Sequence, residues 1–133
     1  MPFEYTYDAE RDLIRTRVHG IVEVQDFLTE LSNQRAGDNM PVATASIINL
    51  LEVERVIASP GLSNVFNIAE ETTDIAGYAN VALVAKDPSI VSLAQLMSSQ
   101  SKSKRSPLLF EVFGTIEEAE EWIRVTPKRT ADR

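Results

Sequence analysis

The sequence predicts an α/β domain with the element order ββαβαβαβα, in which helices lie mainly on one face of a mixed five-stranded sheet. Two observations support this prediction. Residues 45–50 and 81–85 are mostly apolar, which is typical of strands buried on both faces of a sheet. Around them, apolar residues recur three and four positions apart, the spacing of helices with one buried face. A chain of 133 residues, 44% of them hydrophobic, is long enough for one domain with its own core.

The N-terminal part is expected to form a β-hairpin. Aromatic and polar residues alternate from Phe3 to Asp8, and a second alternating run extends from Leu13 to Val18. The polar segment between these runs is short enough for a tight turn. Gly20 is expected to end the second strand.

Four helices are expected, and each has an apolar stripe. The second and third begin at Ser59 and Asp87, because each residue can cap a helix and is followed by a proline that suits the first turn. The last begins at Thr115, which forms a capping box with Glu118. In chain order the stripes are Val24, Phe27, Leu28 and Leu31; Leu62, Val65, Phe66 and Ala69; Ile90, Leu93, Ala94 and Met97; and Ile116, Ala119 and Ile123.

The last strand is expected over residues 108–112, where apolar side chains alternate. Before it, the serine-rich segment 98–106 has no apolar residue and predicts a mobile loop. We expect the single domain to span residues 1–125, and residues 126–133 to form a flexible C-terminal tail.

The topology predicts that one sheet face needs additional cover. Crossovers between parallel strands are right-handed almost without exception, so the last three strands should be parallel and the crossover helices should share one face. The doubly apolar strands then leave a second face whose exposure would cost several kcal/mol. We expect the first helix or a second subunit to cover it, and therefore expect self-association as a dimer.

Composition excludes several classes of function. The chain has no cysteine and one histidine, His19, which excludes thiolate and multi-histidine metal sites; no cofactor is expected. A net charge of −7 argues against nucleic-acid binding. The five glycines are too scattered for a phosphate-binding loop. There is no signal-peptide pattern and no apolar run approaching ~20 residues, so we expect a cytoplasmic protein without stable membrane insertion.

Polar residues at the predicted strand ends are candidates for chemistry, and each has a structural explanation as well. Asn49, Lys86 and Asp87 follow the two buried strands, where α/β proteins bind their ligands. Asp87 is also explained as a helix cap and Asn49 as a tie within a loop. No serine or cysteine accompanies His19 in the sequence. We therefore predict no catalytic residue and a non-enzymatic protein.

Three stretches resemble the STAS-like, or SpoIIAA-like, proteins of bacteria. They are FEYTYDAERDLIRTRVHGIVEVQDFLTEL, SIINL with the later SPGLSNV, and LLFEVFGTIEEAEEWI. The resemblance covers residues 3–124 and implies a protein-interaction or regulatory module with an unidentified regulatory protein as partner. In that family, which includes anti-sigma-factor antagonists, a kinase phosphorylates a serine or threonine at the start of the helix after the third strand.

The resemblance carries this phosphorylation site over to Ser59 and its neighbours. Ser59 and Gly61 match the family pattern, whereas Ala58 replaces an aspartate and Pro60 stands at the phosphorylated position. The implied phospho-switch or partner surface comprises Ser59, Gly61 and Ser63. A serine beside a helix N-terminus can hold a phosphate, and Ser59 is also explained as a helix cap.

A second interpretation is a carrier or sensor that binds a small apolar ligand or lipid between the helices and the sheet. Soft and aromatic side chains suit such a pocket, although they also fill solid cores. The predicted lining residues are Phe27, Leu31, Phe66, Met97, Phe110 and Trp122.

Overall fold

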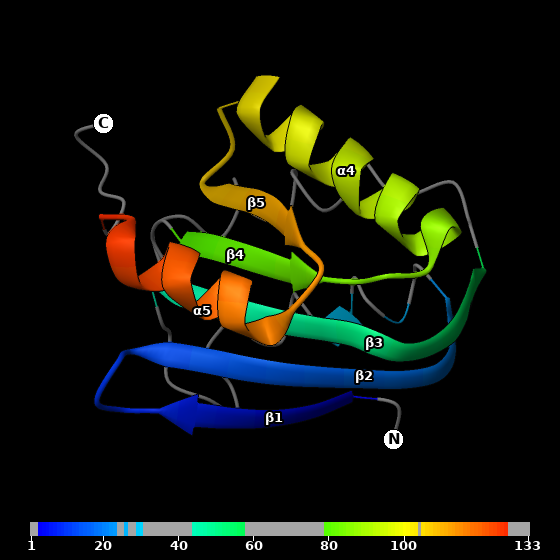
Figure 1. Ribbon diagram of the computed structural model, residues 1–133, viewed down its shortest axis with the longest axis horizontal. Helices are drawn as coiled ribbons and strands as arrows, with labels where there is room; N and C mark the ends of the chain where they lie inside the picture. Colours follow the sequence, from blue (N-terminus) through cyan, green and yellow to red (C-terminus); the bar gives the residue numbers. More distant parts are fainter. Residues whose placement is uncertain are drawn as a thin grey trace.

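The computed structural model describes residues 3–23, 26, 29–30, 44–57, 79–103 and 105–127. Within them, five strands form one sheet in the order β1-β2-β3-β4-β5 (Figure 1). β1 is antiparallel to β2, and each later strand is parallel to the one before it. This confirms the predicted mixed five-stranded sheet. The elements are β1 Phe3–Asp8, β2 Leu13–Glu23, β3 Ala45–Ile57, β4 Ala79–Val84, α4 Pro88–Ser103, β5 Leu108–Phe113 and α5 Ile116–Val125.

Most of the first predicted helix and all of the second lie outside the described residues. The third and fourth are α4 and α5, and both begin where the sequence predicts. Asp87 Oδ1 accepts hydrogen bonds from the backbone N–H of Ser89 at 3.0 Å and from its hydroxyl at 2.6 Å. The Glu118 N–H donates to Thr115 Oγ1 at 3.1 Å. Each cap satisfies a donor that the first helical turn leaves free.

β2 and β3 extend beyond their predicted ends and form a two-stranded arm. The prediction that Gly20 ends β2 is wrong, because the strand continues to Glu23. Gly20 adopts a φ of +78° at an irregularity in the strand pairing, a conformation that glycine tolerates without strain. β3 continues to Ile57, although its pairing with β4 stops at Asn49. We call residues 20–23 together with residues 53–57 the β2–β3 arm.

Two bulges in β3 explain why the sequence did not reveal this arm. Each inserts one extra residue against β2, which breaks the alternation of period two by which strands are recognised. After Ile48, the side chains of β3 that pack on the core come from Leu50, Val53 and Val56, at a spacing of three. The pairs that bracket the bulges are Arg17 with Asn49, His19 with Glu52, Gly20 with Val53, and Ile21 with Arg55.

The sheet is packed on both faces. On one face, Ile90, Ala94 and Met97 of α4 join a core cluster with strand residues such as Leu83. On the other, Ala119 of α5 is completely buried in a cluster with Leu13, Ala45, Ile47, Ala82 and Val84. The two described helices thus take one face each. α5 supplies cover that the sequence analysis assigned to the first helix or to a second subunit. It is not a crossover helix, so the handedness rule does not confine it to the face of α4.

The serine-rich segment 98–106 was predicted to be a mobile loop, and this prediction is wrong. α4 continues to Ser103, and Ser98 and Ser101 are buried. The Ser101 hydroxyl donates to the Ser98 carbonyl at 2.7 Å and accepts from the Phe110 N–H at 3.2 Å. A serine hydroxyl can be buried when it is hydrogen-bonded inside the protein. The serine-rich segment can therefore pack against the rest of the domain without apolar side chains.

Candidate functional site

The sheet face that carries α5 is covered only in part. α5 packs on β3, β4 and β5, and no described helix overlies the right-hand halves of β2 and β3 in Figure 1. At the boundary, Arg15 of β2 forms an ion pair with Glu120 of α5 at 2.7 Å. We call the uncovered surface the open face. Its residues are Glu4, Arg17, His19, Ile21, Glu52, Arg55 and Ile57.

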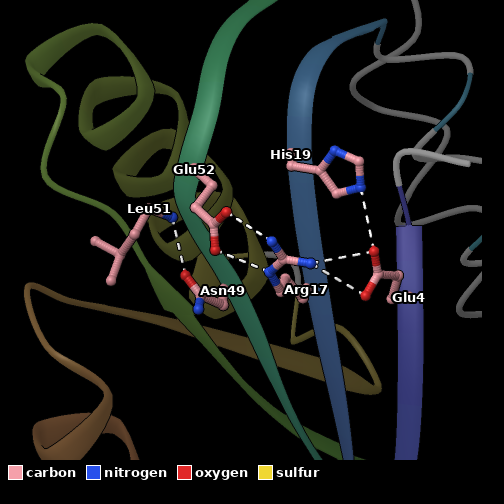
Figure 2. A network of polar contacts seen from close by, with 6 residues as sticks. All are labelled: Glu4, Arg17, His19, Asn49, Leu51 and Glu52. Carbon is pink, nitrogen blue, oxygen red and sulfur yellow. Dashed lines mark hydrogen bonds and ion pairs between the residues drawn. The ribbon is translucent and has the colours of Figure 1, made fainter.

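Arg17 is the centre of a polar network on this face (Figure 2). Its Nε and Nη2 donate to the two carboxylate oxygens of Glu52, at 2.8 and 2.7 Å. Its Nη1 donates to both oxygens of Glu4 at 3.1 Å. His19 Nε2 lies 3.3 Å from Glu4 Oε2. One guanidinium group therefore links the side chains of three neighbouring strands.

The strand register places these side chains together. Glu4 lies directly opposite Arg17 in the antiparallel β1–β2 pair. Glu52 reaches Arg17 because the first bulge of β3 follows Asn49, the residue paired with Arg17. Asn49 Oδ1 accepts a hydrogen bond from the Leu51 N–H at 2.9 Å inside this bulge. The Asn49 side chain thus acts as a local tie that shapes the network.

Both partners of the Arg17–Glu52 pair favour their charged forms. The hydrogen bond from Arg17 lowers the pKa of the Glu52 carboxyl, and the same bond raises the pKa of the guanidinium. The side chains are 46% and 51% exposed, so water screens the attraction and the pair adds little to stability. The structural effect of Arg17 is to hold the carboxylates of Glu52 and Glu4 in fixed orientations at the surface.

Two isoleucines of the arm lie on the same face. Ile21 is 54% exposed and Ile57 is 40% exposed. Ile21 pairs with Arg55 and Glu23 pairs with Ile57, which makes the two isoleucines diagonal neighbours. The alternate residues of the arm, such as Val22, pack on the core. One side of the arm is therefore apolar and faces the core, and the other side is partly apolar and faces solvent.

A small apolar cavity lies on the opposite face of the sheet. Its volume is about 50 Å³, and it is lined by Phe3, Val18, Val22, Glu23, Leu50, Val56, Leu83, Ile90, Leu93, Ala94 and Met97. Apart from Glu23, every one of these side chains is apolar.

The structure brings together only some of the predicted ligand-lining residues. Met97 lines the cavity, and Phe110 is fully buried in the same core cluster. Trp122 lies across the sheet in the other cluster, where its ring centroid is 5.6 Å from that of Phe113. The remaining predicted residues lie outside the described part of the chain; they are Phe27, Leu31 and Phe66 for the ligand, and Ser59, Gly61 and Ser63 for the phospho-switch.

Asp87, one of the candidates for chemistry at the strand ends, has a structural partner. Ser89 binds the Asp87 carboxylate at the start of α4 and lowers its pKa, as expected for a helix cap. Within the described residues, no three metal-ligating side chains gather into a group that could hold a metal ion. None of the helices described is long and apolar enough to cross a membrane.

Sequence reasoning missed the open face. Glu4 and Arg17 were assigned to strands but not to a surface, Ile21 was placed beyond the end of the second strand, and Glu52 and Ile57 were placed in a loop. The available signal was the exposed side of the second strand, where Arg15, Arg17 and His19 alternate with Thr16 and Val18. The partners of this row are known only once β3 is placed beside β2.

Solved structures share this fold. SpoIIAA, an anti-sigma factor antagonist, in its unphosphorylated form has a TM-score of 0.54 and 18% identity, over 93% of this chain and 99% of that chain. An uncharacterised DUF3478-family protein from Shewanella loihica PV-4, with a SpoIIAA-like fold, has a TM-score of 0.53 and 10% identity, over 91% of each chain. The Bacillus cell fate determinant SpoIIAA in its phosphorylated form has a TM-score of 0.51 and 18% identity, over 92% of this chain and 99% of that chain. No protein-family model and no curated protein matches the sequence. The chain has a SpoIIAA-like fold.

Proposed function

We propose that this protein is a non-enzymatic regulatory module that acts by binding another protein. The observation that carries the proposal is the SpoIIAA-like fold, which extends over 93% of the chain in the comparison with an anti-sigma factor antagonist. The open face agrees with such a role, because exposed aliphatic side chains rimmed by charged ones are typical of protein-interaction surfaces.

Phosphorylation of Ser59 is the regulatory step in this proposal. Ser59 follows the last residue of β3, Ile57, by two positions in the sequence. A phosphate adds a charge of about −1.5 to −2 at neutral pH. That charge would change which partner surface the protein accepts.

The experiment compares tagged wild-type protein with Ser59→Ala and Ser59→Asp in cells of the source organism. Cross-linking identifies the bound protein, which is then purified so that its affinity can be measured. We expect a stoichiometric complex with wild type and Ser59→Ala, at least tenfold weaker binding by Ser59→Asp, and a mass increase of ~80 Da, one phosphate group, on the Ser59 peptide. Equal binding by all three proteins would remove the phospho-switch, and the absence of any stoichiometric partner would contradict the interaction role.

A second candidate function is a sensor of a small apolar ligand, favoured by the cavity that Met97 helps to line. A volume of about 50 Å³ is small beside the ~150 Å³ cavity that holds benzene in an engineered protein core, so only a few ligand atoms would be enclosed. Native mass spectrometry of the purified protein should detect a bound molecule that a bulkier residue at Ala94 displaces. A protein that carries no ligand under these conditions would eliminate this candidate.

A further inference from the structure

We infer that the open face is a docking surface for a basic segment of a partner protein. In this complex a Lys or Arg side chain of the partner binds Glu4 and Glu52, and an adjacent aliphatic side chain covers Ile21 and Ile57. The inference rests on the proposed function and deepens it, because it names the surface used and the chemistry of the partner.

The Arg17 network orders two carboxylates for a cation. Three nitrogens of Arg17 are used to hold Glu52 and Glu4, whose side chains remain 51% and 56% exposed. A carboxylate oxygen accepts more than one hydrogen bond, so both groups keep capacity on their solvent side. Because Arg17 already fixes their orientation, an incoming cation loses less entropy in ordering them.

The charge of the Arg17 network favours a basic partner. Glu4 and Glu52 supply two negative charges, whereas Arg17 supplies one positive charge. One added Lys or Arg side chain brings the network to neutrality. A second copy of this chain would instead bring another network of the same sign, within a molecule of net charge −7.

The exposed isoleucines provide the apolar part of the contact. Five large hydrophobic side chains are exposed in the described residues: Ile21, Leu51, Ile57, Leu96 and Val125. Only Ile21 and Ile57 are neighbours on one sheet surface beside a charged network. Leu96 on α4 and Val125 on α5 are 46% and 57% exposed, so they provide controls of matched exposure on other elements.

The test is a titration of the ¹⁵N-labelled protein with a synthetic amphipathic peptide of leucine and lysine, followed by amide chemical shifts. A matched peptide with glutamate in place of lysine is the charge control. We expect shifts confined to β1, β2 and β3 with the lysine peptide, and no binding of the glutamate peptide. The double variants Ile21→Ser/Ile57→Ser and Glu4→Gln/Glu52→Gln should each weaken the affinity at least tenfold. Leu96→Ser and Val125→Ser should leave it unchanged.

Other outcomes would overturn the inference. One is chemical shifts that map to other elements, and another is unchanged affinity in the isoleucine double variant when circular dichroism and thermal unfolding match wild type. A third is a dimer of the wild type that this variant abolishes, since a second copy would then occupy the face. The two proposals fail separately. If a cellular partner binds the open-face variants as tightly as wild type, only this inference is contradicted. If the peptide binds but no cellular partner is found, only the proposed function is contradicted.

Discussion

Replacing Ala94 by valine is expected to stabilise the protein, because Ala94 lines the apolar cavity. A cavity lowers stability by about 24 cal/mol per Å³, so a volume of about 50 Å³ corresponds to about 1.2 kcal/mol. Valine is less favourable than alanine within a helix by up to about 0.7 kcal/mol. The net gain expected for Ala94→Val is therefore about 0.5 kcal/mol.

The matched control is Ala119→Val on α5. Ala119 is completely buried in the cluster on the other sheet face, so added methyl groups should overpack it at a cost of about 1–3 kcal/mol. The cost of valine in a helix is common to both variants and cancels in their comparison. The free energies of unfolding of Ala94→Val and Ala119→Val should then differ by about 2–4 kcal/mol.

Denaturant unfolding followed by circular dichroism measures these differences, provided that the slope m is the same in all proteins. Equal destabilisation by the two valines would refute the reasoning, because it would mean that the space beside Ala94 cannot take a side chain. If a ligand fills that space, wild type should lose stability when the ligand is removed, and Ala94→Val should not.

Three further predictions concern single interactions. Arg17 lowers the pKa of Glu52 in the folded protein, so the stabilisation is complete above the ordinary value of 4.5 and is lost as the pH falls through the folded value. The stability difference between wild type and Glu52→Gln should therefore shrink in acid unfolding titrations, and a constant difference would contradict the pairing. Gly20→Ala should cost about 1–2 kcal/mol in denaturant unfolding from its positive φ alone, since no atom would lie within 4 Å of the new Cβ; Gly20→Asn should cost less. Thr115→Ala should lower stability by about 1 kcal/mol in thermal unfolding through loss of the bond to the Glu118 N–H, and Thr115→Ser should retain most of it.

The sheet and the two C-terminal helices were accessible from sequence because local rules decide them. Val81 and Leu83 are buried on one face, while Ala82 and Val84 are buried on the other, so the run reads as a central strand. The caps at Asp87 and Thr115 act within three residues of themselves, and such short-range bonds follow directly from residue order.

The β2–β3 arm and the open face were not accessible in this way. The bulges remove the alternation from residues 50–57, so no periodic signal marked the end of β3. The bond between Arg17 and Glu52 joins residues 35 positions apart, and it depends on how the two strands are aligned. Ser59, Gly61 and Ser63 remain predictions based on a resemblance. Of the residues on the open face, the sequence analysis considered only His19 as a candidate for chemistry.

The position of α5 after the last strand of the sheet has a consequence for biosynthesis. Each strand pairs with its predecessor in sequence, so the sheet can assemble progressively as the ribosome advances. The side chains of Leu13, Ile47 and Val84 nevertheless stay exposed to solvent until residues 116–125 have been synthesised, because α5 covers them. A nascent or truncated chain that stops before this point exposes apolar strand residues to chaperones and to other chains, and the emergence of α5 from the ribosome ends that exposure.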